Sequence, residues 1–416
     1  LFLKNMENSY LSEFKRREYF NQCTNSEELE QLMHKKTIRA YIGFDCTAPS
    51  LHVGSLMQIM CLRLLQKYGH QPIVLLGGGT TRIGDPSGKE ETRRILSERE
   101  IEKNIKNIEK IFKIFLKSKS PKTKPIFINN YKWLGKLNYI NFLREIGKHF
   151  TINKMLSFDS VKLRLDREQS LSYMEFNYMI LQAYDFLELN KSKNCLLQIG
   201  GSDQWGNIVN GVDLIKRHSN KQVYGLTTPL ITLASGVKMG KTEKGAIWLD
   251  KKLLSSYDYW QFWRNTDDRD VIRFLKMFTD LETKKIDELK NKNINQLKIL
   301  LANETTAMLH GKSAANNAEL TAKNTFEKKS IGDDLPTVKI KKEKFVSSIN
   351  IVELVVMSNL LNSKSEVRRM IKNNGIKINN NNVENDQLNI TLTDFNNQNF
   401  LKLSCGKKNH VIIKII

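Results

Sequence analysis

The spacing of apolar residues predicts a strand, a helix and a second strand near the start of the chain. Residues 38–44 form an apolar run typical of a buried strand, and residues 45–50 read as a turn. From 52 to 68 apolar residues recur at helical spacing, and Gly69 ends the run. Another strand at 72–76 precedes three glycines. This order predicts a βαβ unit, and therefore a parallel sheet with a right-handed crossover.

The pattern continues as a doubly wound α/β domain to about residue 230. Helical patterns follow at 92–118 and 136–147, and a strand at 195–199 ends in Gly200-Gly201. Ligands of such sheets bind at the carboxyl ends of the strands. Glycines at 43, 77–79 and 200–201 stand at those ends, so we expect the functional site there.

The rest of the chain predicts different architecture. Residues 250–325 read as charged amphipathic helices, and the charged segment 327–345 as a linker. The end predicts a small α/β module with helices at 351–361 and 364–373 and strands at 375–379, 389–392 and 410–416. We therefore expect a catalytic domain at 1–235, a helical domain at 236–326, the linker, and a C-terminal module at 346–416.

Composition excludes some classes of protein. The chain has 416 residues, 40% of them hydrophobic, and its apolar runs are far shorter than the ~20 residues of a membrane helix. The five cysteines form no CxxC pair, which argues against a zinc site and a disulfide framework, and a reducing cytoplasm fits. The net charge of +22 favours polyanionic partners, although lysine is abundant everywhere and also fits a general compositional bias.

The segment YIGFDCTAPSLHVGS at 41–55 is a candidate nucleotide site. His52 and Gly54 open a helix after a strand and a turn, where N–H groups and the helix dipole favour phosphate. Gly54 would let an adenine ring lie against the backbone, while His52 could donate to phosphate oxygens. The alternative is a helix start with an incidental histidine.

The segment KMGKT at 238–242 places two lysines in a glycine-containing loop. Lysines so placed suit the developing charge of a departing pyrophosphate, although a solvated loop has the same composition. A P-loop is disfavoured because residues 236–242 read G-x-x-x-G-K-T, one residue short, and no helical pattern follows. The run GDPSGKE at 84–90 fails as a P-loop for the same reasons.

A third segment, 175–186, predicts a helix with a polar face. Tyr178, Gln182 and Asp185 stand at i, i+4 and i+7 and so share one side. They could line a polar cleft or form a solvated stripe.

Together these segments, with IGDPSGKEETR at 83–93 and LQIGGSDQWGN at 197–207, resemble the bacterial tyrosyl-tRNA synthetases of class I. His52-Val53-Gly54-Ser55 is similar to the His-Ile-Gly-His signature of that family, and residues 238–242 to its Lys-Met-Ser-Lys-Ser loop. The likeness runs from about residue 10 to the end of the chain. It implies a Rossmann-like catalytic domain, a helical anticodon-binding domain, and a C-terminal RNA-binding module.

The resemblance assigns residues to the substrate tyrosine. Tyr41 and Asp185 would hold the phenol, and Gln204 would lie near the carboxylate. The ammonium would meet Tyr178, Gln182 and Asp85, with Asp45 and Asp203 on the ammonium or ribose side.

The resemblance also assigns residues to ATP. Those expected to stabilise its phosphates as pyrophosphate leaves are Thr47, His52, Lys238, Lys241 and Thr242, assisted by Lys89 and Arg93. Gly43, Gly54, Ser55, Gly201 and Asp203 would complete the ATP site. Mg²⁺ would accompany ATP, held by phosphates and water and not by a dedicated protein site. The tyrosine carboxylate attacks the α-phosphorus itself, so no residue is needed as a nucleophile.

Two residues depart from the family pattern. Ser55 stands where the signature has its second histidine, and Cys46 where many relatives have proline. Serine still provides a hydrogen bond, so we expect a modest kinetic change.

Partners follow from the same resemblance. Arg368, Arg369 and Lys372 cluster on a predicted helix and would bind phosphates of the tRNA, although a solvated helix face has the same pattern. The family also implies a homodimer, whereas the cysteines favour a cytoplasmic location and the short apolar runs argue against a membrane partner. Tryptophanyl-tRNA synthetase, which shares the scaffold, and an RNA-binding relative without catalysis remain alternatives.

Overall fold

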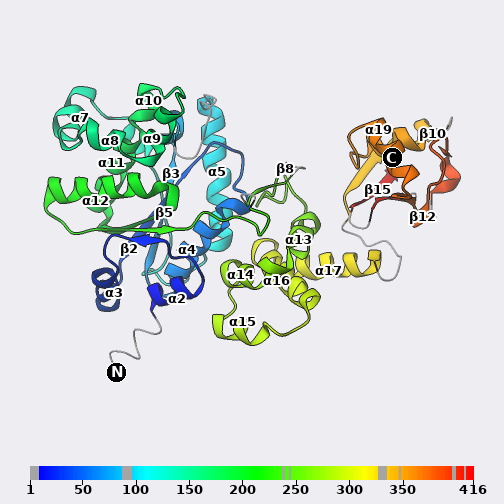
Figure 1. Ribbon diagram of the computed structural model, residues 1–416, viewed down its shortest axis with the longest axis horizontal. Helices are drawn as coiled ribbons and strands as arrows, with labels where there is room; N and C mark the ends of the chain where they lie inside the picture. The colour runs from blue at the N-terminus through cyan, green and yellow to red at the C-terminus, as the bar shows by residue number, and fades with distance from the viewer. Residues whose placement is uncertain are drawn as a thin grey trace. The chain divides into compact units, whose positions relative to one another are not determined.

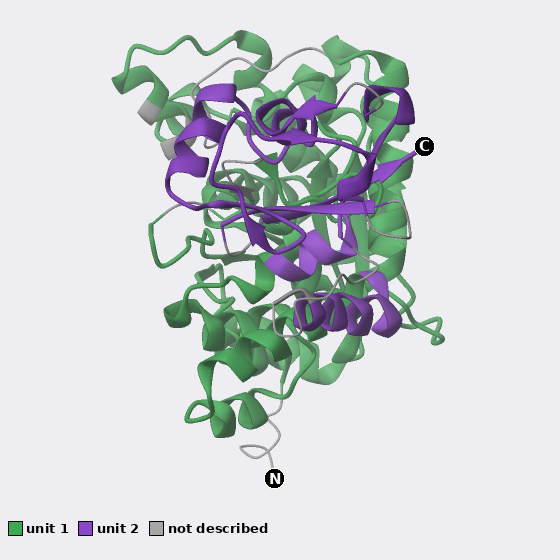
Figure 2. Cartoon of the chain, turned by 90° about the vertical axis from the view of Figure 1, so that its right-hand side faces the viewer, with its two compact units in different colours: residues 1–254, 262–309 green, residues 255–261, 310–416 purple. Residues whose placement is uncertain are grey.

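The computed structural model describes residues 9–86, 96–236, 239–242, 245–326, 335–345, 348–395, 400–406 and 409–416. It forms two compact units, residues 1–254 with 262–309 and residues 255–261 with 310–416 (Figure 2). These divisions do not coincide with the expected domain boundaries, which stay predictions.

A mainly parallel sheet forms the centre of the first unit (Figure 1). Among the described residues its order is β1-β6-β5-β2-β3-β4, and only β1 runs antiparallel to its neighbour. The strands are β1 (Gln22–Cys23), β2 (Arg39–Asp45), β3 (Gln71–Gly77), β4 (Ile126–Asn129), β5 (Cys195–Gly201) and β6 (Tyr224–Thr228). The predicted βαβ unit is confirmed, since β2 and β3 pair in parallel on either side of α4 in the sequence. β4 and β6 were not predicted.

Helices cover both faces of this sheet. Successive strand residues point to opposite sides, so each face contributes its own side chains to a core. Tyr41 and Ile73 share a core with residues of α11 and α12, such as Phe186. On the other face Phe44 contacts Phe112 of α5, with ring centroids 4.6 Å apart. The helices up to α12 are α2 (Tyr10–Arg16), α3 (Ser26–Lys35), α4 (Leu56–Lys67), α5 (Glu98–Phe115), α6 (Tyr131–Leu134), α7 (Tyr139–Glu145), α8 (Ile152–Leu156), α9 (Asp159–Asp166), α10 (Tyr173–Phe176), α11 (Tyr178–Lys193) and α12 (Trp205–Ser219).

The helical character predicted for residues 250–325 is confirmed, with helices from Ser256 onward. The helices are α13 (Ser256–Arg264), α14 (Val271–Phe278), α15 (Thr283–Leu289), α16 (Ile294–His310) and α17 (Lys312–Phe326). A short β7 (Lys241–Thr242) pairs with β8 (Gly245–Ala246) before them. Within the first unit the ring of Trp263 packs on Phe274 and Phe278, which is the apolar contact that such helices need for stability.

The C-terminal part of the chain is a second α/β assembly. Its described strands form a sheet in the order β12-β11-β14-β15-β9. They are β9 (Thr337–Ile340), β11 (Ile376–Ile378), β12 (Asn381–Asn382), β14 (Phe400–Cys405) and β15 (Asn409–Ile415), and β10 (Ile349–Asn350) pairs separately with β13 (Asn389–Ile390). The helices α18 (Ile351–Met357) and α19 (Lys364–Lys372) lie where helices were predicted.

Two predictions for this region were wrong. The described part of the predicted linker, residues 335–345, contains β9, which pairs in parallel with β15, because Val338 and Ile340 join the module's apolar core. Residues 400–405 form a strand between β11 and β15, although no strand was predicted there. Their alternating apolar side chains, Leu401 and Leu403, carried the signal.

Candidate active site

Polar side chains gather at the carboxyl end of β2. Asp45, the last residue of the strand, accepts hydrogen bonds from the Thr80 hydroxyl at 2.7 Å and from the Tyr178 hydroxyl at 3.1 Å. A Cβ on Gly77 would lie 2.4 Å from the Asp45 carboxylate, so only glycine permits this approach of β3. The parallel register of β2 and β3 thus puts Asp45 beside the glycine loop, as the sequence predicted for a ligand site.

Hydrogen bonds also link a second group of amide and carboxylate side chains. The Gln204 side chain donates to Asp85 at 2.9 Å. The Asn207 amide donates to Gln182 at 3.0 Å and to Gln204 at 3.1 Å. The fold therefore brings together Asp85, Gln182 and Gln204, three residues distant in sequence. Asn207 was not among the predicted site residues, although it belongs to the run that carried the resemblance.

Asp185 is the most deeply buried carboxylate of this region, with 2% of its surface exposed. Its two oxygens accept hydrogen bonds from the Asn130 amide at 2.9 Å and the Trp133 indole N–H at 2.7 Å. Burial raises its pKa to about 7, against the opposing effect of these two donors. The sequence pattern did not reveal either donor. Asn130 directly follows the end of β4, a position comparable to that of Asp45 at the end of β2.

Tyr41 lies close to this carboxylate. Burial raises the pKa of Tyr41 well above its usual value, and the charge of Asp185 adds to the effect. Among the described residues its hydroxyl has no hydrogen-bond partner. A buried hydroxyl without a partner is costly, so this group is suited to a polar atom of a ligand.

The turn that begins at His52 packs against residues 247–249. The Nδ1 atom of His52 accepts the Gly54 N–H at 3.0 Å, which leaves the proton of a neutral imidazole on Nε2. The Val53 N–H donates to the Ile247 carbonyl at 2.9 Å, and the Leu249 N–H donates to the Leu51 carbonyl at 2.8 Å. These bonds join the His52 turn to residues 247–249, which follow the candidate segment 238–242.

Glycines make this close approach possible. A Cβ on Gly54 would lie 2.8 Å from the Met239 carbonyl, and one on Gly240 would lie 2.9 Å from the His52 ring. The expected contact of adenine with Gly54 stays a prediction. In this structure Met239 and His52 border the space next to the Gly54 α-carbon.

The remaining predicted residues lie in several settings. Lys89, Arg93 and Lys238 fall outside the described residues, and of Lys241 and Thr242 only the backbone of β7 is described. Gly43, Thr47 and Asp203 are exposed, and a Cβ on Gly201 would lie 2.5 Å from the Asp203 carboxylate. Ser55 caps α4 without a side-chain hydrogen bond.

The backbone of Cys46 is held by two hydrogen bonds at the position where many relatives have proline. Its N–H donates to the Thr81 hydroxyl at 2.7 Å, and its carbonyl accepts from Asn104 at 2.9 Å. Proline has no N–H and could not make the first of these bonds.

Comparisons with known proteins show the family of the chain. Residues 33–327 match the model of the family described as tRNA synthetases class I (W and Y), and residues 327–413 match the Tyrosine--tRNA ligase SYY-like C-terminal domain. Tyrosine--tRNA ligase of Pelagibacter ubique is 69% identical over 98% of this chain and 100% of its own length. That of Rickettsia massiliae is 50% identical over the same shares.

The chain belongs to the tyrosyl-tRNA synthetases of class I. The fold agrees, since a C-terminally truncated mitochondrial tyrosyl-tRNA synthetase of Aspergillus nidulans superposes with a TM-score of 0.70. That structure is 29% identical and covers 77% of this chain and 94% of its own. The chain is therefore an ATP-dependent tyrosine--tRNA ligase, as its family is.

The residues predicted to bind RNA in this synthetase lie on α19. Arg368, Arg369 and Lys372 are exposed, while Val367 and Ile371 of the same helix are buried. Arg368 forms an ion pair with Asp386 at 3.3 Å, which neutralises part of the cluster.

The described residues of the synthetase show neither a metal-binding cluster nor a membrane-spanning helix. They hold no group of three or more histidine, cysteine, aspartate or glutamate side chains arranged for a metal ion. In the same residues no helix is long and apolar enough to cross a membrane.

Replacing Gly240 by alanine is expected to lower kcat for ATP–pyrophosphate exchange at least tenfold. Gly240 has φ of +132°, and its new Cβ would meet the His52 ring, so the loop must move away from His52. The matched control is Gly236→Ala, with φ of +83° and nothing within 4 Å. An equal loss in both variants would mean that backbone strain, and not the contact with His52, limits the reaction.

Proposed function

We propose that the chain joins tyrosine to ATP, forming tyrosyl-adenylate and pyrophosphate, and then transfers tyrosine to the terminal adenosine of its tRNA. The observation that carries the proposal is that the Tyr41 hydroxyl has no hydrogen-bond partner among the described residues and that the charge of the buried Asp185 carboxylate acts on it. A phenol can donate to the Asp185 carboxylate and accept from the Tyr41 hydroxyl, whereas phenylalanine would leave the Tyr41 hydroxyl unpaired and add no donor to the carboxylate.

In the activation step the protein positions reactants and stabilises charge. Tyr178, Asp85 and Gln182 would receive the ammonium, with Asp45 bonded to Tyr178 behind it. The carboxylate of tyrosine attacks the α-phosphorus, and the bond to the pyrophosphate oxygen breaks. His52 Nε2, Thr47, Lys238, Lys241 and Thr242 would stabilise the charge that develops on pyrophosphate, assisted by Lys89 and Arg93.

The other ATP contacts are proposed from their position. Gly43, Gly54, Ser55, Gly201 and Asp203 would line the nucleotide near the carboxyl ends of β2 and β5. Mg²⁺ would reach the site with ATP and neutralise phosphate charge, held mostly by phosphates and water.

In the transfer step a ribose hydroxyl of the tRNA attacks the carbonyl of the adenylate, and AMP leaves. We assign the tRNA contacts to a helical anticodon-binding domain at 236–326 and to the C-terminal module, including Arg368, Arg369 and Lys372. The catalytic domain is proposed to be Rossmann-like, and the protein to act in the cytoplasm.

The test is amino-acid-dependent ATP–pyrophosphate exchange with all twenty amino acids in parallel. Exchange with tyrosine alone is expected. Exchange with tryptophan in its place would keep the mechanism and overturn the assignment of Tyr41 and Asp185. A folded protein that exchanges with none would contradict the proposal.

The pH dependence of tyrosine activation should follow the ionisation of the Asp185 carboxylate. Because burial raises its pKa to about 7, the carboxylate is protonated at lower pH and then accepts the phenol hydrogen poorly. We expect kcat/KM for tyrosine in the exchange reaction to fall about tenfold per pH unit below 7, with the KM for ATP unaffected. A flat profile between pH 5.5 and 8 would contradict this role for Asp185.

We also propose that the synthetase is a homodimer. Large apolar side chains on α7 to α10 are exposed, namely Tyr139, Ile140, Leu143, Ile152, Leu156, Leu165, Tyr173 and Met174. Such a concentration within 36 residues is unusual for a free surface, and a second copy of the chain would cover it.

Replacing Ile140 and Ile152 together by glutamate is expected to convert the dimer to a monomer in sedimentation equilibrium. Both side chains are exposed, so the substitutions disturb no core. The control is Lys103→Glu with Lys106→Glu, two exposed positions on α5. A wild-type chain that sediments as a monomer would overturn the proposal.

A further inference from the structure

The turn after β2 carries Thr47, which is assigned to the phosphates of ATP, and it belongs to no helix or strand. β2 ends at Asp45, and residues 46–51 are irregular. Within the part of the chain that the structure describes, residues 47–49 make no hydrogen bond. The course of the chain through Thr47 is therefore set largely at Cys46, the first residue after the strand.

The peptide groups on both sides of Cys46 are held by side chains from distant parts of the sequence. The Cys46 N–H donates to the Thr81 hydroxyl at 2.7 Å, and the Cys46 carbonyl accepts from the Asn104 amide of α5 at 2.9 Å. Cys46 is 0% exposed, Asn104 7% and Thr81 9%. Loss of either bond would therefore leave a backbone polar atom unpaired and away from water.

Thr81 lies beside a second threonine that holds the same turn. Both belong to the short 3₁₀ helix Thr80–Arg82, which follows the glycine loop after β3. The Thr80 hydroxyl donates to the Asp45 carboxylate at 2.7 Å. Two adjacent threonines thus hold two adjacent residues of the chain, one through a side chain and the other through the backbone.

The thiol of Cys46 is not the group that matters at this position. Its Sγ lies 3.6 Å from the Phe44 carbonyl, and burial raises the pKa of the thiol to about 12, so the side chain is neutral and a poor nucleophile. Cysteine differs from the proline of many relatives in two other ways. It has an N–H that needs an acceptor, and no ring fixes its φ at about −65°.

We propose that Thr81 and Asn104 are positioning residues for tyrosine activation; this rests on the proposed function. By fixing the peptide groups of Cys46 they keep the Thr47 hydroxyl at the phosphates of ATP. Charge stabilisation in a transition state depends on donors that are in place before the reaction begins. A turn that has lost one of its two anchors holds Thr47 less well, so the rate falls. Tyrosine binding stays intact, because Asp45 is held separately.

The test compares Thr81→Val with Thr81→Ser in the full chain. Valine has nearly the shape of threonine but offers no acceptor, whereas serine keeps the hydroxyl. We expect Thr81→Val to lower kcat for tyrosine-dependent ATP–pyrophosphate exchange about tenfold, with the KM for tyrosine within about twofold of the wild type. Thr81→Ser should keep kcat within about twofold, and thermal melts check the folding of both variants.

A double-variant cycle separates positioning from a general loss of packing. In Cys46→Pro no N–H remains to be paired and the ring fixes φ, so adding Thr81→Val should then cost less than about twofold in kcat. Cys46→Ala keeps the N–H and should behave like the wild type. In that background Thr81→Val should cost the full factor of about ten.

Asn104→Leu removes the other anchor, and kcat should fall at least about fivefold with the KM for tyrosine unchanged. The proposal would be overturned by a folded Thr81→Val enzyme with the kcat of the wild type, or by an equal loss in the Cys46→Pro background. If either of these variants does not fold, Asn104→Leu decides. A normal kcat, or a KM for tyrosine that rises as kcat falls, would contradict the proposal. Failure of the proposed function looks different, because the wild type would then show no exchange with tyrosine.

Discussion

Replacing Asp185 by asparagine is expected to lower kcat/KM for tyrosine in pyrophosphate exchange by about 100-fold. The carboxylate is buried and takes two hydrogen bonds, from Asn130 and Trp133. The side-chain NH2 group of asparagine would point at the N–H of Asn130 or Trp133. Its carbonyl oxygen would be a weaker acceptor for the phenol. Loss of a charge-assisted hydrogen bond costs about 1.5–3 kcal/mol, to which the donor–donor contact adds.

A control and a second site variant accompany this substitution. Glu188→Gln removes a carboxylate one turn along α11, where the side chain pairs only loosely with Lys191 at 3.9 Å, and should leave kcat/KM within about twofold. Tyr41→Phe removes a hydroxyl without a described partner and should cost about tenfold. The role of Asp185 would be refuted by an Asp185→Asn enzyme that melts like the wild type and activates tyrosine normally.

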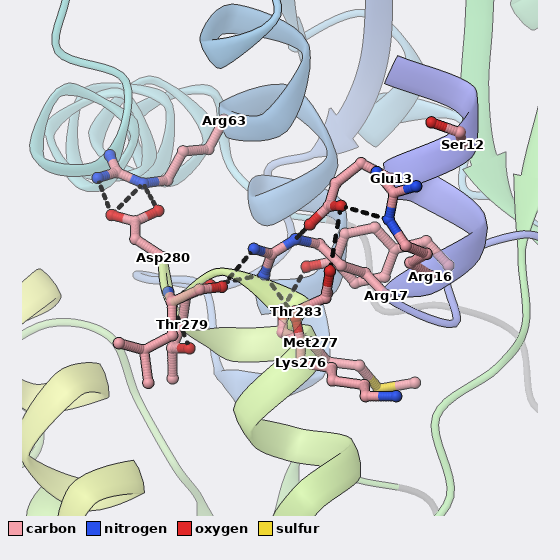
Figure 3. A network of polar contacts seen from close by, with 12 residues as sticks. Ser12, Glu13, Arg16, Arg17, Arg63, Lys276, Met277, Thr279, Asp280 and Thr283 are labelled. Atoms are coloured by element: carbon pink, nitrogen blue, oxygen red, sulfur yellow. Dashed lines mark hydrogen bonds and ion pairs between the residues drawn. The ribbon is translucent and has the colours of Figure 1, made fainter. Parts of the chain in front are cut away.

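Replacing Arg17 by methionine is expected to lower the free energy of unfolding by about 3–5 kcal/mol. Figure 3 shows the Arg17 guanidinium between α2 and the corner that joins α14 to α15. It pairs with Glu13 at 2.8 Å and donates to the carbonyls of Lys276, Thr279 and Leu281 at 2.7, 2.8 and 2.7 Å. Methionine would leave the buried Glu13 charge and these carbonyls without their shared donor.

Arg16 provides the matched control for this substitution. It also pairs with Glu13, at 2.9 Å, but its side chain is 37% exposed, against 3% for Arg17. Water can replace the lost contact, so Arg16→Met should cost less than about 1 kcal/mol. Urea denaturation followed by circular dichroism measures both. Equal midpoints for the two variants would show that the three carbonyl contacts contribute no stability.

The local sequence pattern was enough to predict the βαβ unit formed by β2, α4 and β3. The apolar run of β2, the helical spacing of α4 and the run of β3 are each readable within a few residues, and a βαβ unit leaves one handedness for the crossover. The same locality explains the failures. β9 was read as linker because its lysines suggested exposure, whereas only its pairing with β15 makes it a strand.

The sequence by itself determined the family, the predicted tyrosine and nucleotide segments, and the helix that carries Tyr178, Gln182 and Asp185. Only the tertiary structure decided what surrounds them. The donors to Asp185 come from residues 130 and 133, more than fifty positions earlier. The physical reason is that local spacing fixes which side a residue faces, while burial and pairing depend on distant segments that only the folded chain brings together.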